Sequence, residues 1–349
     1  MFLHNVDNSS LENEWLMLPS KLYEKVGNKP LMLIDDVQKV FMESRNSFLR
    51  QGEYRRWIVY DLYNLVAGRI AAFAKNGDEI GRIGFFECID DTEVAQGLFN
   101  TCCNWLAARG CKIVEGPVNF GEKDRFWGLM VSGFDSKGLY LDNFNPNYYQ
   151  RLFEQSGFTP KEKIYTYQVR LEDVPVQRME DVYNWSQARY HFSYEHFDWS
   201  REDALVEAIH AVYTQAFDAG KRIGHITQQD IRHLLGQAKP LLNEKHFWFA
   251  YRAEKPVGFL MFLNEPGSVG AGQKKLLKGF AFAMAPEVTN KGVEIGLTYH
   301  FYRQLLKENS LYDLMLSGIN ARSSKMNSMI EKLGGRIAKV HNVYQLKIN

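Results

Sequence analysis

The sequence predicts an α+β fold with two tandem domains, each a mixed central sheet with helices on both faces. The chain has 349 residues, which is enough for about two domains. Segments that alternate bulky apolar residues with small or polar ones, as strands do, are interleaved with segments of helical periodicity. Their order occurs twice: helix, hairpin, strand, long helix, strand, short helix ending at glycine, and strand. This recurrence indicates an internal repeat at the scale of a domain.

The first half, residues 1–180, contains one copy of this order. It starts with an apolar segment, 11–25, that Pro19 interrupts. The expected elements are a helix at 35–50, a hairpin of strands 56–63 and 65–73, a strand at 80–89, a helix at 92–109, a strand at 112–118, a short helix at 146–155 and a strand at 163–170. The loop at 119–144 is long, and long loops in compact domains usually serve a function.

The second half repeats the order after a weakly patterned stretch, 171–190, which includes Pro175. We place the domain boundary in this stretch, between domains 1–180 and 185–349. The expected elements are a strand at 191–197, helices at 201–217 and 228–235, a hairpin of strands 246–251 and 257–263, a strand ending before Pro286, a helix reaching Leu306, a strand at 314–319, a helix at 323–333 and a strand at 343–348.

The composition argues against several classes of partner. The formal net charge is +1, which gives no support for nucleic acid or an anionic membrane as the main partner. A run of about 18 apolar residues, the mark of a membrane span, is absent from the sequence. The N-terminus is polar and lacks the pattern of a signal peptide, so we expect a cytoplasmic protein.

No metal site is expected either. The cysteines, Cys88, Cys102, Cys103 and Cys111, do not have the spacing of zinc ligands, and no histidine is close to them in sequence. We expect small buried side chains in a reducing compartment. His225 and His233 lack an acidic partner at ligand spacing.

The stretch from Leu276 to Leu306 combines a strand, a turn and a helix. Phenylalanine and methionine alternate with alanine up to Pro286, which cannot donate into a sheet and ends the strand. A polar turn at 289–292 follows, and then a helix. Unpaired N–H groups at a helix N-terminus attract anions, so the stretch is a candidate anion site. An ordinary strand-to-helix connection is the alternative interpretation.

The ordered motifs resemble a known family. VGFLMF (257–262), AMAPEVTNKGVEIG (283–296) and EKLGG (331–335) look like the GCN5-related N-acetyltransferase (GNAT) fold. The first half resembles a diverged copy through VAGRIAAF (66–73), GFFECIDDTEVAQGLF (84–99) and NPNYYQRLFEQSGF (145–158). Together the halves resemble bacterial proteins with tandem acetyltransferase-like domains. The resemblance covers most of residues 50–349 and implies acetyl-CoA or another acyl-CoA as co-substrate.

The resemblance also implies a cofactor site in the second half. Backbone N–H groups around Met284 and Ala285, left free where the strand ends, would polarise the thioester carbonyl. Asn320 would contact the pantetheine arm. The pyrophosphate would lie on the turn and the helix start, at Asn290, Lys291, Gly292, Val293, Glu294 and Gly296.

Some positions depart from the family pattern. Thr289 and Glu294 replace the expected Gln or Arg and the expected small residue of the turn, and Glu294 puts a carboxylate close to the pyrophosphate. Family members often have a tyrosine acid before the glycine of the last helix. That position is Ile330 in the second half and Phe153 in the first. The first half also has a shorter, acidic turn at 89–93, so we expect it not to bind CoA.

The acceptor site is less defined by the sequence. Asn119, Asp124, Tyr148 and Tyr149 are speculative substrate-binding residues on the long loop and the following helix. The general base is not identified; Glu265 and His246 are titratable residues on the expected sheet. A small-molecule or peptide amine is the expected substrate, and the sequence indicates no oligomeric state.

The sequence leads to two hypotheses about function. The first is an acyl-CoA-dependent N-acyltransferase in which an amine attacks the thioester directly. The second is a non-catalytic ligand-binding or interaction protein on a decayed tandem scaffold, with Thr289, Glu294 and Ile330 as signs of decay.

Overall fold

The computed structural model describes residues 2–24, 29, 34–121, 125–217, 226–267, 274–308 and 310–348. The chain forms two compact units. Unit 1 comprises Met1–Thr166, Gly318–Asn327 and Ile337–Asn349, and unit 2 comprises Tyr167–Ser317 and Ser328–Arg336. The chain therefore passes from one unit to the other several times, whereas the sequence suggested one boundary near residue 180.

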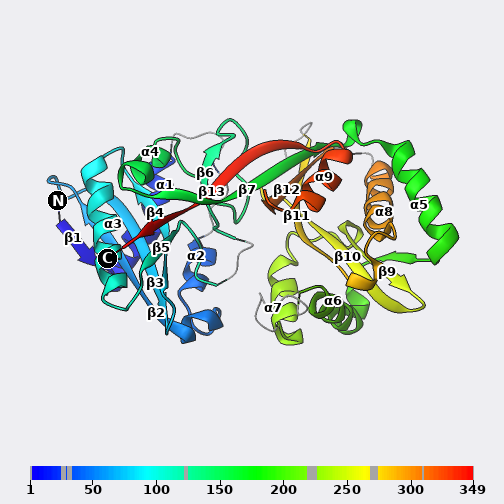
Figure 1. The fold of residues 1–349 in the computed structure, drawn as a ribbon, viewed down its shortest axis with the longest axis horizontal. Coiled ribbons are helices and arrows are strands. Elements are labelled where there is room, and N and C mark those ends of the chain that lie inside the picture. The colour runs from blue at the N-terminus through cyan, green and yellow to red at the C-terminus, as the bar shows by residue number, and fades with distance from the viewer. Residues whose placement is uncertain are drawn as a thin grey trace. The chain divides into compact units, whose positions relative to one another are not determined.

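Unit 1 is built on a mixed sheet (Figure 1). Its strands, in spatial order, are β1 (Phe2–Asn5), β2 (Gly52–Tyr60), β3 (Val66–Lys75), β4 (Ile80–Cys88), β5 (Ile113–Gly116) and β13 (Arg336–Lys347), followed by β7 (Thr159–Arg170). The short strand β6 (Leu129–Ser132) also pairs with β13. Strands β4 and β5 are parallel, and the pairs β1–β2, β2–β3, β3–β4 and β5–β13 are antiparallel.

Helices cover both faces of this sheet. On β3, Ile70 and Ala72 belong to the core under α3 (Thr92–Ala107) and α4 (Tyr149–Gln155). The intervening Ala71 and Phe73 belong to the core under α1 (Ser9–Leu22) and α2 (Ile34–Val40). Because successive strand side chains point to opposite faces, one strand serves two cores.

Unit 2 repeats the plan. Its strands, in spatial order, are β8 (Ser193–His196), β9 (Phe247–Arg252), β10 (Lys255–Asn264), β11 (Lys275–Met284) and β12 (Tyr312–Asn320). Only the pair β11–β12 is parallel among these neighbours. One face packs against α6 (Glu202–Phe217) and α7 (Gln228–Ala238). The other carries α8 (Val293–Lys307), whose Phe301 stacks on Phe262 at a centroid distance of 4.4 Å. The last helix is α9 (Ser324–Lys332).

Several elements differ from the sequence prediction. Helix α5 (Val176–Tyr190) occupies the expected weakly patterned boundary and packs against α8 in unit 2. The segment around Pro19 is helical, and the helix expected at 35–50 ends at Val40. Strand β13 begins at Arg336, earlier than expected. The mixed sheets with helices on both faces confirm the predicted fold class.

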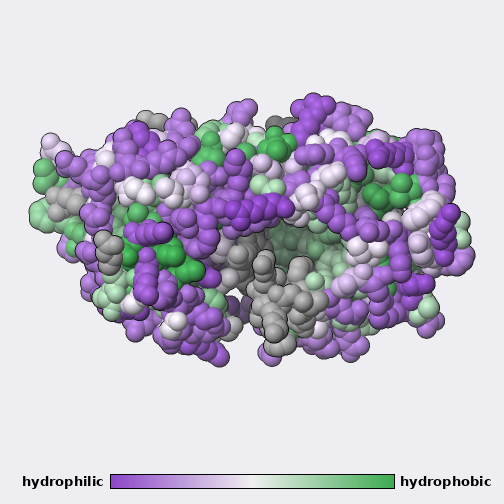
Figure 2. Space-filling model, in the orientation of Figure 1, coloured by the Kyte–Doolittle hydropathy of each residue, from purple (hydrophilic) through white to green (hydrophobic). Residues whose placement is uncertain are grey.

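Polar residues cover most of the face shown in Figure 2, with apolar residues in small patches. Among the described helices, none combines the length and the apolar character that a membrane crossing requires.

Candidate functional site

Strand β11 separates from β12 before its end. The pairing of the two strands runs from Lys275 opposite Tyr312 to Gly279 opposite Leu316. At this point a bulge shifts the register against β10, so that Phe280 is the extra residue. The rest of β11 up to Met284 continues along β10, and the two parallel strands open. In unit 2 this opening lies at the end of β11 that leads to α8.

The backbone N–H groups of Met284 and Ala285 were expected to donate to the thioester carbonyl. Only one of the two faces this opening. The Ala285 N–H donates to the Val257 carbonyl at 2.9 Å, so it is not free, and the expectation for Ala285 is wrong. Met284 lies opposite Gly258, the next pair along the ladder. Because hydrogen-bonded and non-hydrogen-bonded pairs alternate in antiparallel sheets, the Met284 N–H points away from β10, towards the opening.

The turn before α8 leaves the helix N-terminus without a side-chain cap. Asn290 and Gly292 both have left-handed backbones, with φ of 61° and 81°. Gly292 is the N-cap, and a Cβ there would lie 3.0 Å from the Cβ of Ser186 on α5. Ser186 also donates its hydroxyl to the Lys291 carbonyl at 2.6 Å. Helix α5 thus braces the turn, and the first-turn N–H groups that begin at Val293 keep their capacity for an anion.

Glu294 lies in the first turn of α8. Its Oε2 is buried and accepts no hydrogen bond within the described residues. Burial raises the pKa of Tyr194 on β8, and Tyr183 and Glu294 raise it further. A Cβ on Gly296 would come within 2.0 Å of the Tyr194 hydroxyl, so this glycine makes room for the same tyrosine.

The other residues that the resemblance singled out make contacts within the protein itself. The Asn320 amide donates to Glu162 and its oxygen accepts from the Arg322 N–H, all within unit 1. Ile330 and Phe153 stand where the family often has tyrosine, and both are buried among apolar residues.

The two titratable candidates lie far from the opening. His246 contacts Glu308 at 3.2 Å, just beyond the C-terminal end of α8, and burial lowers the pKa of His246. A 15-residue helix is about 22 Å long, so this pair is about that far from the turn. The Glu265 N–H donates to Leu276, near the opposite end of β11 from Met284. Neither residue is placed to accept a proton at the opening.

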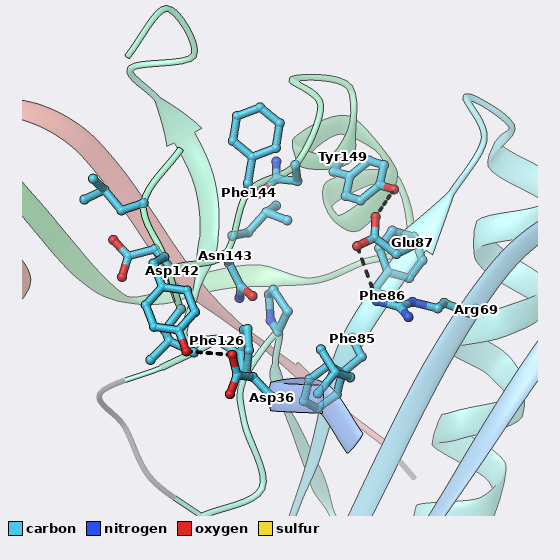
Figure 3. A pocket seen from close by; sticks show the side chains of 17 residues that line it. Asp36, Arg69, Phe85, Phe86, Glu87, Phe126, Asp142, Asn143, Phe144 and Tyr149 are labelled. Atoms are coloured by element: carbon cyan, nitrogen blue, oxygen red, sulfur yellow. Dashed lines mark hydrogen bonds and ion pairs between the residues drawn. The ribbon is translucent and has the colours of Figure 1, made fainter. Parts of the chain in front are cut away.

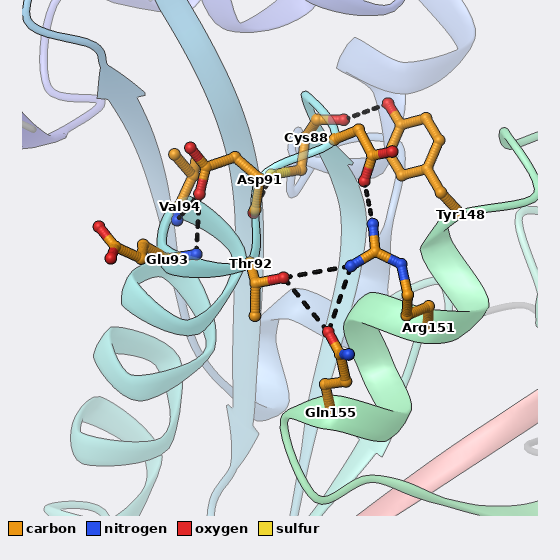
Figure 4. Close-up of polar contacts among 9 residues, drawn as sticks. Cys88, Asp91, Thr92, Glu93, Val94, Tyr148, Arg151 and Gln155 are labelled. Carbon is orange, nitrogen blue, oxygen red and sulfur yellow. Dashed lines mark hydrogen bonds and ion pairs between the residues drawn. The ribbon is translucent and has the colours of Figure 1, made fainter.

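The equivalent helix start in unit 1 is capped by a carboxylate (Figure 4). Asp91 accepts hydrogen bonds from the N–H groups of Glu93 and Val94 at 2.8 and 3.2 Å. Asp90 forms an ion pair with Arg151, which also contacts Thr92. Two first-turn N–H groups of α3 are therefore satisfied, and negative charge stands where an anion would bind.

Unit 1 has a cavity of about 60 Å³ beside β4 (Figure 3). Its walls come from α2, β3, β4, Leu129 of β6, the loop residues Pro117, Phe126 and 139–145, and α4. The Asn145 side chain accepts from the Met130 N–H at 2.7 Å and donates to the Met130 carbonyl at 3.0 Å. These bonds hold the end of the lining loop, residues 139–145, on β6. The cavity is therefore part of a braced structure.

A buried ionic network forms one side of this cavity. Glu87 and Arg69 are cross-strand partners on β4 and β3, with Oε1 and Nη2 3.7 Å apart. Glu87 Oε2 accepts hydrogen bonds from the hydroxyls of Tyr23 and Tyr149. Arg69 donates to the Trp15 carbonyl at 2.6 Å. Burial raises the pKa of Glu87, although Arg69 and the two tyrosines oppose the shift.

Three of the four speculative substrate residues are described, and one of them lines the cavity. Tyr149 lines the cavity, whereas Tyr148 donates to the Cys88 carbonyl at 2.7 Å. Asn119 is buried and accepts from the N–H of Phe120. Asp124 lies outside the described residues.

Sequence reasoning missed Arg69, Glu87 and Tyr23. A signal for the first two was present, since opposite charges stand in two apolar segments that form neighbouring strands. The described residues contain no group of three or more His, Cys, Asp or Glu side chains placed to hold a metal ion.

Comparison with known proteins identifies the fold. No family model matches the chain. A tandem GNAT protein from the clavulanic acid biosynthesis pathway superposes with a TM-score of 0.61 at 10% identity, covering 99% of this chain and 98% of that one. A GCN5-related N-acetyltransferase from Sphaerobacter thermophilus gives 0.56 at 13% identity, covering 99% and 96%. The chain therefore has the tandem GNAT fold, as the sequence predicted.

Two relatives are similar in sequence. The bacterial ceramide synthase of Caulobacter vibrioides (strain NA1000 / CB15N) is 24% identical over 204 residues, which are 58% of this chain and 52% of the synthase. Protein YghO of Escherichia coli (strain K12) is 24% identical over 151 residues, 41% of this chain and 38% of YghO. The match thus spans about half the length of the first relative.

Proposed function

We propose that the chain is an N-acyltransferase that moves an acyl group from a CoA thioester to an amine. The observation that carries this proposal is the opening of β11 from β12 in front of an α8 N-terminus that has no side-chain cap. The fold and the similarity to a ceramide synthase support it, because a ceramide is the amide of a fatty acid and a long-chain amino alcohol.

The acyl-CoA would lie along the opening in unit 2. The N–H groups of the first turn of α8 and the Lys291 ammonium would hold the pyrophosphate. The Met284 N–H would donate to the thioester carbonyl and stabilise the negative charge that develops there. We place the Glu294 carboxylate on the side of Tyr194, whose pKa it raises, and away from the pyrophosphate.

In the proposed reaction the neutral amine attacks the carbonyl carbon. A C–N bond forms, the C–S bond breaks, the amine nitrogen releases one proton to solvent water, and the thiolate gains one. Because Ile330 and Phe153 are apolar, neither supplies that proton, and the thiolate takes it from water.

Binding of octanoyl-CoA to the full chain tests the proposal. At about 100 times its dissociation constant a ligand stabilises the folded state by roughly 2.7 kcal/mol, which a thermal shift detects. Lys291→Glu should weaken binding at least tenfold. Lys307→Glu, the same charge change at the other end of α8, should leave it within twofold. Equal affinity in both variants would contradict the site.

A non-catalytic binding protein is the second candidate. It is favoured by the position of His246 beyond the far end of α8 and by the structural role of Asn320. Release of free CoA thiol from octanoyl-CoA in the presence of long-chain amines separates the two functions. Binding without any amine-dependent release would favour the second.

A further inference from the structure

The cavity of unit 1 has features of a ligand site that its structural role does not require. Three bulky residues that line it, Phe85, Phe126 and Leu141, have left-handed backbones, with φ of 54°, 50° and 66°. Large side chains rarely adopt this conformation, and such strain gathers at functional sites. Phe85 lies on β4, and Phe126 and Leu141 lie on two parts of the loop that lines the cavity. The strained residues therefore come from different segments and share the cavity wall.

The cavity wall carries more negative than positive charge. Asp36, Glu87 and Asp142 contribute carboxylates, and Arg69 is the one cationic side chain among the described lining residues. Asp36 is also paired with Lys39 and accepts a hydrogen bond from the Tyr140 hydroxyl. Carboxylates on the wall of a partly buried cavity favour a cation over an anionic ligand.

Glu87 has one oxygen left for such a cation. Its Oε2 already accepts from Tyr23 and Tyr149. Its Oε1 lies 3.7 Å from Arg69 Nη2, which is an ion pair but too long for a hydrogen bond. An N–H group in the cavity would therefore find an acceptor that is held in place by four other residues, Arg69, Tyr23, Tyr149 and, through Arg69, Trp15.

The size and polarity of the cavity restrict the class of ligand further. The cavity volume of about 60 Å³ exceeds the roughly 10–15 Å³ that one water needs, but it is far too small for a nucleotide. Much of the wall is apolar, including Val37, Leu129, Leu139 and Phe144. These properties fit a primary ammonium group attached to an aliphatic body.

We propose that this cavity binds the ammonium head group of a lipophilic primary amine, with Glu87 as its anchor. This amine site goes beyond the proposed function and does not rest on it, because the cavity lies in unit 1 and the proposed acyl-CoA site lies in unit 2. The ammonium donates one N–H to Glu87 Oε1, and the aliphatic chain lies among the apolar residues.

The full-length chain and three ligands of equal length test the proposal: hexylammonium chloride, hexan-1-ol and hexanoate. We expect hexylammonium to raise the melting temperature and to slow amide hydrogen exchange in peptides covering 84–89 and 139–146. Hexanol should bind at least tenfold more weakly, and hexanoate should give no shift. Equal binding of hexanoate, or no binding of hexylammonium, would overturn the proposal.

Two variants locate the site. Glu87→Gln should lower hexylammonium affinity at least tenfold, whereas Glu79→Gln, an exposed glutamate just before β4, should not change it. Because Glu87→Gln can destabilise unit 1 by leaving Arg69 without its partner, Val37→Phe is the second variant. It fills the cavity and leaves the ion pair intact. Undiminished hexylammonium binding in Val37→Phe would place the ligand elsewhere.

The same variants separate this proposal from the acyltransferase proposal. Octanoyl-CoA should bind Val37→Phe as it binds the original chain. Loss of hexylammonium binding with retained octanoyl-CoA binding supports two distinct sites. Octanoyl-CoA binding without hexylammonium binding in the original chain would contradict the amine site alone.

Discussion

At the scale of single residues, the pKa of Glu87 depends on Arg69. Burial raises the pKa of Glu87 and lowers that of Arg69, since both charged forms lose hydration. The groups that face Glu87 are Arg69 on β3, Tyr23 after α1 and Tyr149 on α4. Removing Arg69 leaves two neutral donors and no cation beside the carboxylate, so its pKa should rise further.

We therefore expect Arg69→Met to destabilise the chain in a pH-dependent way. A carboxyl whose folded pKa is raised contributes stability below its unfolded pKa, near 4.3, and loses it as pH rises through the folded pKa. The loss relative to the original chain should be about 3–5 kcal/mol at pH 8 and clearly smaller at pH 5. Urea unfolding at both pH values measures this. An equal loss at both would mean that Glu87 stays ionised.

Glu294 is the second residue with a defined expectation. Its buried Oε2 has no hydrogen-bond partner among the described residues, so Glu294→Gln removes no hydrogen bond at that oxygen. Stability should stay equal or rise by about 1 kcal/mol. Octanoyl-CoA affinity should change less than threefold, because the carboxylate lies on the side of Tyr194. A tenfold gain would show that it faces the pyrophosphate instead. The exposed Glu287→Gln is the matched control.

At the scale of elements, the strands and their order were predictable, whereas α5 and the cavity were not. Strand β3 alternates between two apolar cores, and this leaves a period of two in the sequence. Helix α5 buries only Met179 and Ser186 beneath α8, which is too narrow a stripe to give a helical pattern. The cavity joins residues from β3, β4, α2 and α4, and no local pattern records such distant contacts.

The α3 N-terminus offers an expectation for an element. Asp91 caps two N–H groups, so Asp91→Ala should cost about 0.5–2 kcal/mol of stability. Asp91→Asn keeps the capping oxygen and should cost less. Urea unfolding of the two variants provides the comparison. If both cost the same, the negative charge at the helix dipole matters more than the hydrogen bonds.

At the scale of the whole molecule, the two halves of the sequence are not two independent folding units. Strand β13 belongs to unit 1, where it pairs with β5 and β6, although its residues lie at the end of the chain. Tyr344 of β13 is fully buried in the same core as Phe153 of α4. A cut at the boundary suggested by the sequence would therefore remove a strand from the interior of the unit 1 sheet.

We expect the fragments 1–180 and 185–349 to fail to fold alone. Fragment 1–180 lacks β13 and would expose the unpaired edge of β5 together with the core around Tyr149. Such an edge promotes aggregation. Co-expression of both fragments should restore a cooperative transition, because all strands of both units are then present. Urea unfolding followed by near-ultraviolet circular dichroism makes the comparison. A cooperative transition in fragment 1–180 alone would show that β13 is an accessory strand and that one boundary near residue 180 is sufficient.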